Sequence, residues 1–186
     1  MARLPSVAPD GDVTDRIRER RGGKLAALDG VLLHSPRFAD GWNTMLGVVR
    51  GASTLPADIR ELTILRVASR NGAEYEWVVH EPLAREAGLG DEQIAAIRVG
   101  GVSGAGGAAG DGLSPAQWAA LAYADAMTVH VSVPDEVFDS VRAHFSEQEA
   151  LELTVTVAAY NMVSRVLVAL EVSPGEDPFG PSVSPG

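Results

Sequence analysis

The chain has 186 residues, of which 46% are hydrophobic, and it carries a formal net charge of −10 and no cysteine. The lack of cysteine excludes disulfides, thiolate metal sites and cysteine nucleophiles. The acidity argues against nucleic acid and anionic membranes as partners, because both repel a negatively charged protein. No segment approaches the roughly eighteen uninterrupted apolar residues of a transmembrane helix, and residues 1–15 lack the apolar core of a signal peptide, so we expect a cytoplasmic protein.

The predicted elements are helices throughout, because apolar residues recur at helical spacing almost everywhere. Start and stop signals place them, in chain order, at residues 12–21, 24–33, 36–49, 56–70, 73–88, 91–99, 115–130, from 134 onward, and 147–172. Two capping boxes begin at Ser114 and Ser146, and Ser35 is a further predicted N-cap. Pro82 lies inside a predicted helix and is expected to kink it. The pattern therefore predicts an all-α fold.

Two segments differ in composition from the helices. Residues 100–112 are almost entirely glycine, alanine and serine, and residues 173–186 hold four prolines and three glycines. Neither can bury enough apolar surface to offset the entropy of ordering, so we expect a flexible loop and a disordered tail attached to a single domain at residues 1–172. The loop lacks the lysine of a P-loop, which argues against a phosphate site.

Ionisable residues lie on the apolar faces of two consecutive predicted helices. Glu61 lies on the apolar stripe of the first, and Glu76 and His80, four residues apart, lie on that of the second. The outer face of the first helix is predicted to carry Arg60, Thr63 and Arg70. Because the turn at residues 71–72 is short, the helices should form a hairpin that sets Glu61 beside Glu76 or His80.

This cluster of Glu61, Glu76 and His80 has three interpretations. An unpaired buried charge costs on the order of several kcal/mol, so these groups must satisfy one another or meet a ligand. Two carboxyls and an imidazole in an apolar pocket could transfer protons near neutral pH. The same side chains could instead form a polar contact that fixes helix register, or supply three metal ligands. Their spacing is not that of the zinc motif His-Glu-x-x-His, and we expect no metal.

The spacing resembles the core pattern of the carboxymuconolactone decarboxylase and AhpD-like superfamily, Glu-x11-Cys-x2-Cys-x3-His. Glu61 and His80 stand at the glutamate and histidine, and Ala73 and Glu76 stand at the two cysteines. In the AhpD-like members the cysteines are the redox pair, while the glutamate and histidine relay protons. The resemblance implies that this chain keeps the relay and cannot perform dithiol redox chemistry. Tyr75 stands where the thiol enzymes place a second relay histidine. A tyrosine can also donate a proton, so Tyr75 is a weaker catalytic candidate.

Further matches extend the resemblance over roughly residues 28–172. They look like the cysteine-free branch that carries Tyr-Glu-Trp-x-x-His, and comprise residues 34–36, 42, 55–56 and 160–165. The resemblance implies an AhpD-like helical bundle built on a helix hairpin, and a homo-oligomer, either a trimer or a hexamer. The candidate substrate-binding residues are His34, Trp42, Trp77, Asn161 and Arg165. The guanidinium of Arg165 suits a substrate carboxylate, and suits equally a core glutamate or a neighbouring subunit.

These observations lead to one functional hypothesis and a rival. The hypothesis is a cofactor-free, decarboxylase-like lyase or an isomerase acting on a small organic acid or lactone. His80 and Glu76 would move a proton, and Glu61 would orient His80 or act as a second acid. The rival is a non-catalytic binding or assembly protein that retains the same helical core.

Overall fold

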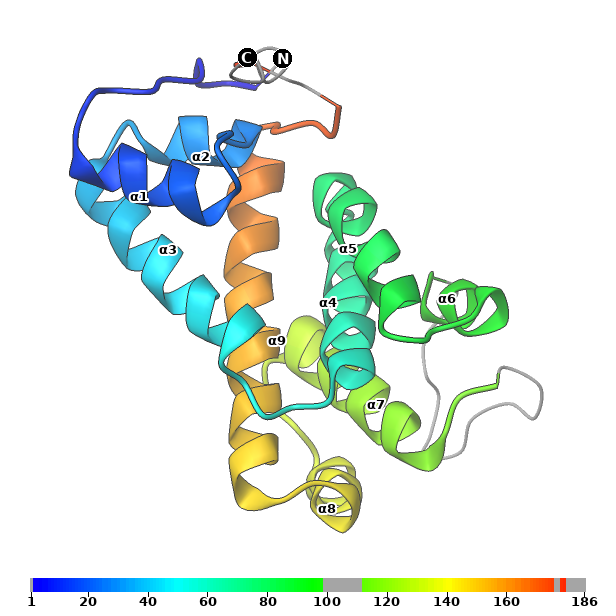
Figure 1. Ribbon diagram of the computed structural model, residues 1–186. Helices are drawn as coiled ribbons and strands as arrows, with labels where there is room; N and C mark the ends of the chain where they lie inside the picture. Colours follow the sequence, from blue (N-terminus) through cyan, green and yellow to red (C-terminus); the bar gives the residue numbers. More distant parts are fainter. Residues whose placement is uncertain (1, 99–111, 176–177, 180–186) are drawn as a thin grey trace. The chain divides into compact units, whose positions relative to one another are not determined.

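All regular structure in the described part of the chain is α-helical (Figure 1). A computed structural model describes residues 2–98, 112–175 and 178–179. The helices are α1 (Asp12–Arg20), α2 (Ala27–Leu32), α3 (Pro36–Gly51), α4 (Ala57–Asn71), α5 (Glu74–Glu86), α6 (Asp91–Arg98), α7 (Pro115–His130), α8 (Asp135–His144) and α9 (Glu147–Ala169). The predicted all-α fold is confirmed. The expected loop, apart from Gly112, and residues 176–177 and 180–186 of the expected tail lie outside the described residues.

Local signals fix the starts of α7 and α9. Ser114 Oγ accepts the Gln117 N–H at 3.2 Å and Gln117 Oε1 accepts the Ser114 N–H at 2.9 Å, so this capping box is confirmed. The box at Ser146 has the same reciprocal bonds with Glu149. Ser35 occupies the N-cap position of α3, but its side chain makes no capping hydrogen bond.

Two helix boundaries differ from the prediction by three residues. α9 ends at Ala169, three residues before the predicted end at 172, because Glu171 adopts a left-handed φ of 53° that cannot continue a right-handed helix. α2 begins at Ala27 rather than Lys24, and the Asp29 carboxylate accepts the Ala26 N–H at 2.8 Å to start it.

Of the described residues, 2–52, 169–175 and 178–179 form one compact unit, and 53–98 and 112–168 form the other. In the first unit α1–α3 enclose a small core made of Ile17, Leu25, Leu33 and Ala39, with Phe179 packed against it. A single domain over residues 1–172 stays a prediction.

The second unit contains α4 to α8 and most of α9, and α4 is its central helix (Figure 1). α4 contacts α5, α6 and α7, and its residues from Ile59 to Ala68, apart from Arg60, are buried. Gly72 ends α4 with a left-handed φ of 64°, and the Ala73 N–H donates to the Ala68 carbonyl at 2.9 Å. This closed turn lets α5 fold back along α4 as the predicted hairpin.

Of the described helices, α9 is the one that is long and apolar enough to cross a membrane by length and composition. Within its most apolar window, 44% of the residues are buried inside the protein. A core helix of a globular domain has the same character, so this observation is weak evidence for a membrane span.

Candidate functional site

The position of Glu61 follows from the central place of α4. Helices α5, α6 and α7 pack against α4, so the face predicted to point outward is largely covered. Thr63 on that face is fully buried, and Arg60 is half-buried. The amphipathic interpretation of this helix was therefore wrong, because a helix enclosed by neighbours has no solvent side. Glu61 points inward as expected and is 4% exposed.

Glu61 and His80 are in direct contact across the hairpin of α4 and α5. His80 Nδ1 lies 2.7 Å from Glu61 Oε2, and both side chains are buried. The second carboxylate oxygen, Oε1, accepts Arg60 Nε at 3.2 Å. A carboxylate can only accept, so Nδ1 carries the proton in this pair, and in the neutral form of the imidazole Nε2 is the basic nitrogen.

The other nitrogen of His80 meets a residue of α9. Tyr160 Oη lies 3.1 Å from His80 Nε2, and the rings meet edge to face with centroids 5.0 Å apart. Tyr160 is 1% exposed. The sequence analysis placed Tyr160 inside the family resemblance without giving it a role. The available signal was its spacing of four residues from Ser164 on an apolar helix.

Glu76 occupies the neighbouring position on α5 and also meets α9. Ser164 Oγ lies 3.0 Å from Glu76 Oε2 and 2.8 Å from the carbonyl oxygen of Tyr160, so the hydroxyl proton faces both acceptors. Glu76 and His80 are thus paired with Ser164 and Tyr160, each pair spaced by four residues, and the helices run in opposite directions. The hairpin and α9 bring the three predicted ionisable residues into one polar network.

The metal interpretation finds no support in this arrangement. In the described part of the chain, no group of three or more histidine, aspartate or glutamate side chains is placed to hold a metal ion. The proton-transfer and structural interpretations both remain compatible with the contacts of Glu61, Glu76 and His80.

Two of the other candidates on α5 lie near this network in sequence. Tyr75 is half-buried. Trp77 is 3% exposed, its Nε1 donates to Glu81 at 2.8 Å, and the Arg98 guanidinium lies 4.6 Å from its ring centroid. This pairing gives Trp77 a structural role in joining α5 to α6. Substrate contact by Tyr75 and Trp77 stays a prediction.

Asn161 and Arg165 are engaged with each other on α9. Arg165 Nη1 donates to Asn161 Oδ1 at 2.6 Å and to the Asn161 carbonyl at 2.9 Å. Asn161 Nδ2 donates to Thr128 Oγ1 of α7 at 3.0 Å, and Asn161 Oδ1 accepts Asn71 Nδ2 at 3.1 Å. These bonds fix the rotation of α9 beside Tyr160. A substrate-binding role for Asn161 and Arg165 stays a prediction.

His34 and Trp42 belong to the first compact unit. His34 is exposed, and its Nε2 lies 2.7 Å from the Pro5 carbonyl oxygen. Trp42 is half-buried on α3. Their predicted part in substrate binding stays a prediction.

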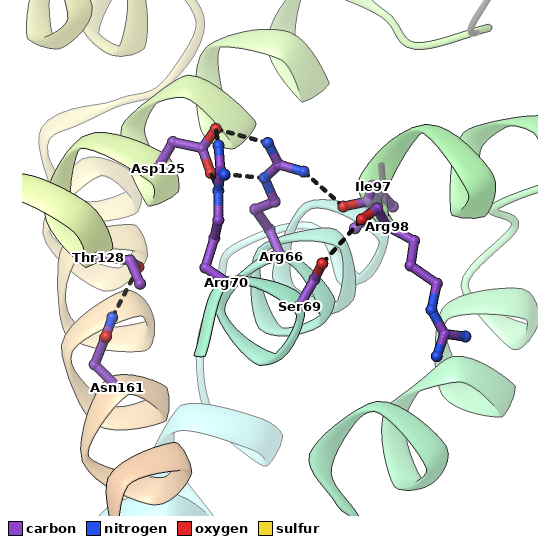
Figure 2. A network of polar contacts seen from close by, with 8 residues as sticks. All are labelled: Arg66, Ser69, Arg70, Ile97, Arg98, Asp125, Thr128 and Asn161. Atoms are coloured by element: carbon purple, nitrogen blue, oxygen red, sulfur yellow. Dashed lines mark hydrogen bonds and ion pairs between the residues drawn. The ribbon is translucent and has the colours of Figure 1, made fainter. Parts of the chain in front are cut away.

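A second buried polar cluster, which the sequence analysis did not find, joins α4, α6 and α7 (Figure 2). Arg66 donates to both carboxylate oxygens of Asp125 at 2.6 and 2.7 Å, and Arg70 does the same at 2.7 and 2.6 Å. Arg66 Nη1 and Ser69 Oγ also hold the last carbonyls of α6, those of Ile97 and Arg98. Burial acts to raise the pKa of the Asp125 carboxyl, but the hydrogen bonds from Arg70 and Arg66 outweigh burial and lower it.

The sequence profile of the carboxymuconolactone decarboxylase family matches residues 36–126, which include Glu61, Glu76 and His80. Residues 36–126 belong to this family. An uncharacterised Bacillus subtilis protein, YdfG, is 28% identical over 120 residues, which are 63% of this chain and 77% of YdfG.

Two solved structures have the same fold as this chain. A peroxidase-related protein with an alkylhydroperoxidase AhpD core, from Ralstonia eutropha JMP134, has a TM-score of 0.77 at 19% identity, covering 96% of this chain and 94% of its own. The debrominase Bmp8, bound to 2,3,4-tribromopyrrole, has a TM-score of 0.71 at 18% identity, covering 94% of this chain and 95% of its own. The predicted AhpD-like fold is confirmed, and the chain has no cysteine with which to form a redox pair.

Proposed function

We propose that this carboxymuconolactone decarboxylase family protein is a cofactor-free lyase or isomerase that moves a proton on a small organic acid or lactone. The observation that carries the proposal is the 2.7 Å contact between Glu61 Oε2 and His80 Nδ1 among buried side chains. The carboxylate holds the imidazole in the tautomer with a basic Nε2, and it stabilises the imidazolium that forms when Nε2 takes a proton.

The chemistry requires only proton transfer and stabilisation of charge. In the decarboxylation of a β-keto acid, the bond to the carboxylate breaks, carbon dioxide leaves, and the electron pair remains as an enolate that is then protonated on carbon. In an isomerisation, the same site removes a proton from one carbon and returns it to another. Both reactions suit a His80 that alternates between imidazole and imidazolium.

The rival function is a binding or assembly protein in which this network only fixes helix register. The observation that favours it is burial: Glu61, Glu76, His80, Tyr160 and Ser164 are each at most 5% exposed. A buried network whose members satisfy one another can be retained for structural specificity alone.

A substrate screen with matched histidine variants separates these functions. The probes are acetoacetate, oxaloacetate and α-angelica lactone, scored by release of carbon dioxide or by change in ultraviolet absorbance. We expect His80→Gln to lower kcat by ~10²–10⁴-fold on a probe that the protein turns over. His144→Gln, a change at an exposed position at the end of α8, is the control and should retain full activity.

Full activity of His80→Gln on such a probe would contradict the proposal. Turnover of none of the probes, together with loss of folding stability in His80→Gln, would favour the structural rival. The chain has no cysteine, so we also expect no consumption of hydroperoxide with a dithiol donor above the rate of heat-denatured protein.

A further inference from the structure

His80 uses both ring nitrogens on protein partners. Nδ1 faces Glu61 Oε2 at 2.7 Å, and Nε2 faces Tyr160 Oη at 3.1 Å. Since the Nδ1–H donates to the carboxylate, Nε2 of the neutral imidazole is an acceptor and the Tyr160 hydroxyl is its donor. In this arrangement the nitrogen that would act as the base of His80 is already engaged by a phenol.

We propose that Tyr160 is the catalytic residue that exchanges a proton with the substrate, and that His80 acts behind it as a positioning residue. This inference rests on the proposed function. The order Glu61, His80, Tyr160 is that of a carboxylate, an imidazole and a hydroxyl linked by hydrogen bonds, in which the hydroxyl group meets the reacting atom.

The proton balance of the step is closed. The Tyr160 oxygen takes a proton from the carbon beside a substrate carbonyl, while the proton of its own hydroxyl passes to His80 Nε2. The substrate becomes an enolate, and the imidazolium is stabilised by Glu61. Reversal of both transfers delivers a proton to the new carbon and restores the neutral imidazole, so no oxidant, reductant or co-reactant is needed.

The packing of α5 against α9 supports this assignment. Ser164, one turn after Tyr160, bonds to Glu76, one turn before His80, so two matched contacts set the register of the helices. Asn161, next to Tyr160, ties α9 to α7 through Thr128 at 3.0 Å (Figure 2). Tyr160 is 1% exposed, so contact with substrate there excludes bulk water and favours proton transfer to the substrate over exchange with solvent.

Tyr123 offers a matched control in the same unit. It is 4% exposed, and its hydroxyl lies 2.8 Å from Thr154 Oγ1, a neutral partner. Tyr123→Phe and Tyr160→Phe therefore each remove one tyrosine hydroxyl group from a buried residue. Only the second change removes a hydroxyl that faces an imidazole.

The first measurement needs no substrate. The protein contains four histidines, and ¹⁵N labelling of histidine, with His80→Gln to assign the signals, reports the protonation of each ring nitrogen. We expect His80 at neutral pH to carry its proton on Nδ1, and the Nε2 resonance to shift in Tyr160→Phe and stay in place in Tyr123→Phe. A proton on Nε2 of the wild-type protein would make Tyr160 an acceptor and would overturn the inference.

The second measurement uses the probe from the screen that the wild-type protein turns over. We expect Tyr160→Phe to lower kcat by ~10²–10⁴-fold with little change in KM, and Tyr123→Phe to change kcat less than about twofold. Loss of activity in His80→Gln with full activity in Tyr160→Phe overturns this inference and leaves the proposed function standing. Full activity in both variants overturns the proposed function as well.

Discussion

Glu61 and His80 are 19 residues apart in the chain, yet their side chains meet at 2.7 Å between Oε2 and Nδ1. The left-handed Gly72 between α4 and α5 makes this contact possible, because it lets the two helices fold back on each other. The contact is charge-assisted and buried, so its removal has consequences for folding as well as for catalysis.

Replacing the charge of Glu61 should weaken the fold measurably. Glu61→Gln keeps an oxygen acceptor for His80 but loses the charge, which roughly halves the strength of such a bond. We expect a loss of about 1–2 kcal/mol in the free energy of unfolding, measured by urea denaturation at neutral pH. Glu74→Gln is the control, because Glu74 is exposed and its contact with Arg98 is 3.3 Å long; it should change stability by less than about 0.5 kcal/mol. Equal losses in the two variants would contradict the special role of Glu61.

Replacing Asp125 should strongly lower the free energy of unfolding. Asp125→Asn leaves Arg66, which is 1% exposed, and Arg70 without their carboxylate. Removing one partner from a buried ion pair costs about 3–5 kcal/mol, and we expect a loss of that size in a urea titration. Asp139→Asn on the exposed side of α8 provides the comparison and should be nearly neutral. A small effect of Asp125→Asn would show that solvent reaches the cluster.

Stability in acid should depend on Glu152. Hydrogen bonds from Gln148, and from Ser53 and Thr54 before α4, lower the pKa of this carboxyl from 4.5 to about 2. Because the pKa in the folded protein lies below that in the unfolded chain, the stabilisation is complete above the unfolded pKa and is lost as the pH falls from about 4.5 to about 2. Glu152→Gln should therefore be less stable than wild type at neutral pH, and the two urea midpoints should converge in this acidic range. A constant difference between the midpoints would refute the linkage.

The two serines that begin α7 and α3 should respond differently to the same substitution. Ser114→Ala removes the acceptor of the Gln117 N–H and should cost about 1 kcal/mol of stability. Ser35→Ala removes a side chain that makes no capping bond, so the thermal midpoint should barely move. If both variants were equally destabilised, the hydroxyl of Ser114 would not be the source of the effect.

Much of the fold was predictable because its signals are local. A capping serine, a proline at the start of a helix and a glycine after its end act within one turn, so the sequence places most helix ends within a few residues. The spacing of Glu61 and His80 on two consecutive helices was enough to predict their contact, because a short turn leaves antiparallel packing as the available geometry. The lack of cysteine excluded dithiol chemistry without any structure.

The partners of these residues were decided by tertiary structure. Tyr160 is 80 residues from His80 and Asp125 is 59 residues from Arg66. Helical periodicity tells which face of a helix is buried, but it does not tell which distant helix covers that face. The same limit explains the error on α4: Thr63 and Arg70 were placed on an outer face, whereas packing against α5, α6 and α7 buries Thr63 and pairs Arg70 with Asp125. The sequence determined which ionisable and polar side chains each helix carries, and the packing of the helices decided which of these side chains form hydrogen bonds with one another.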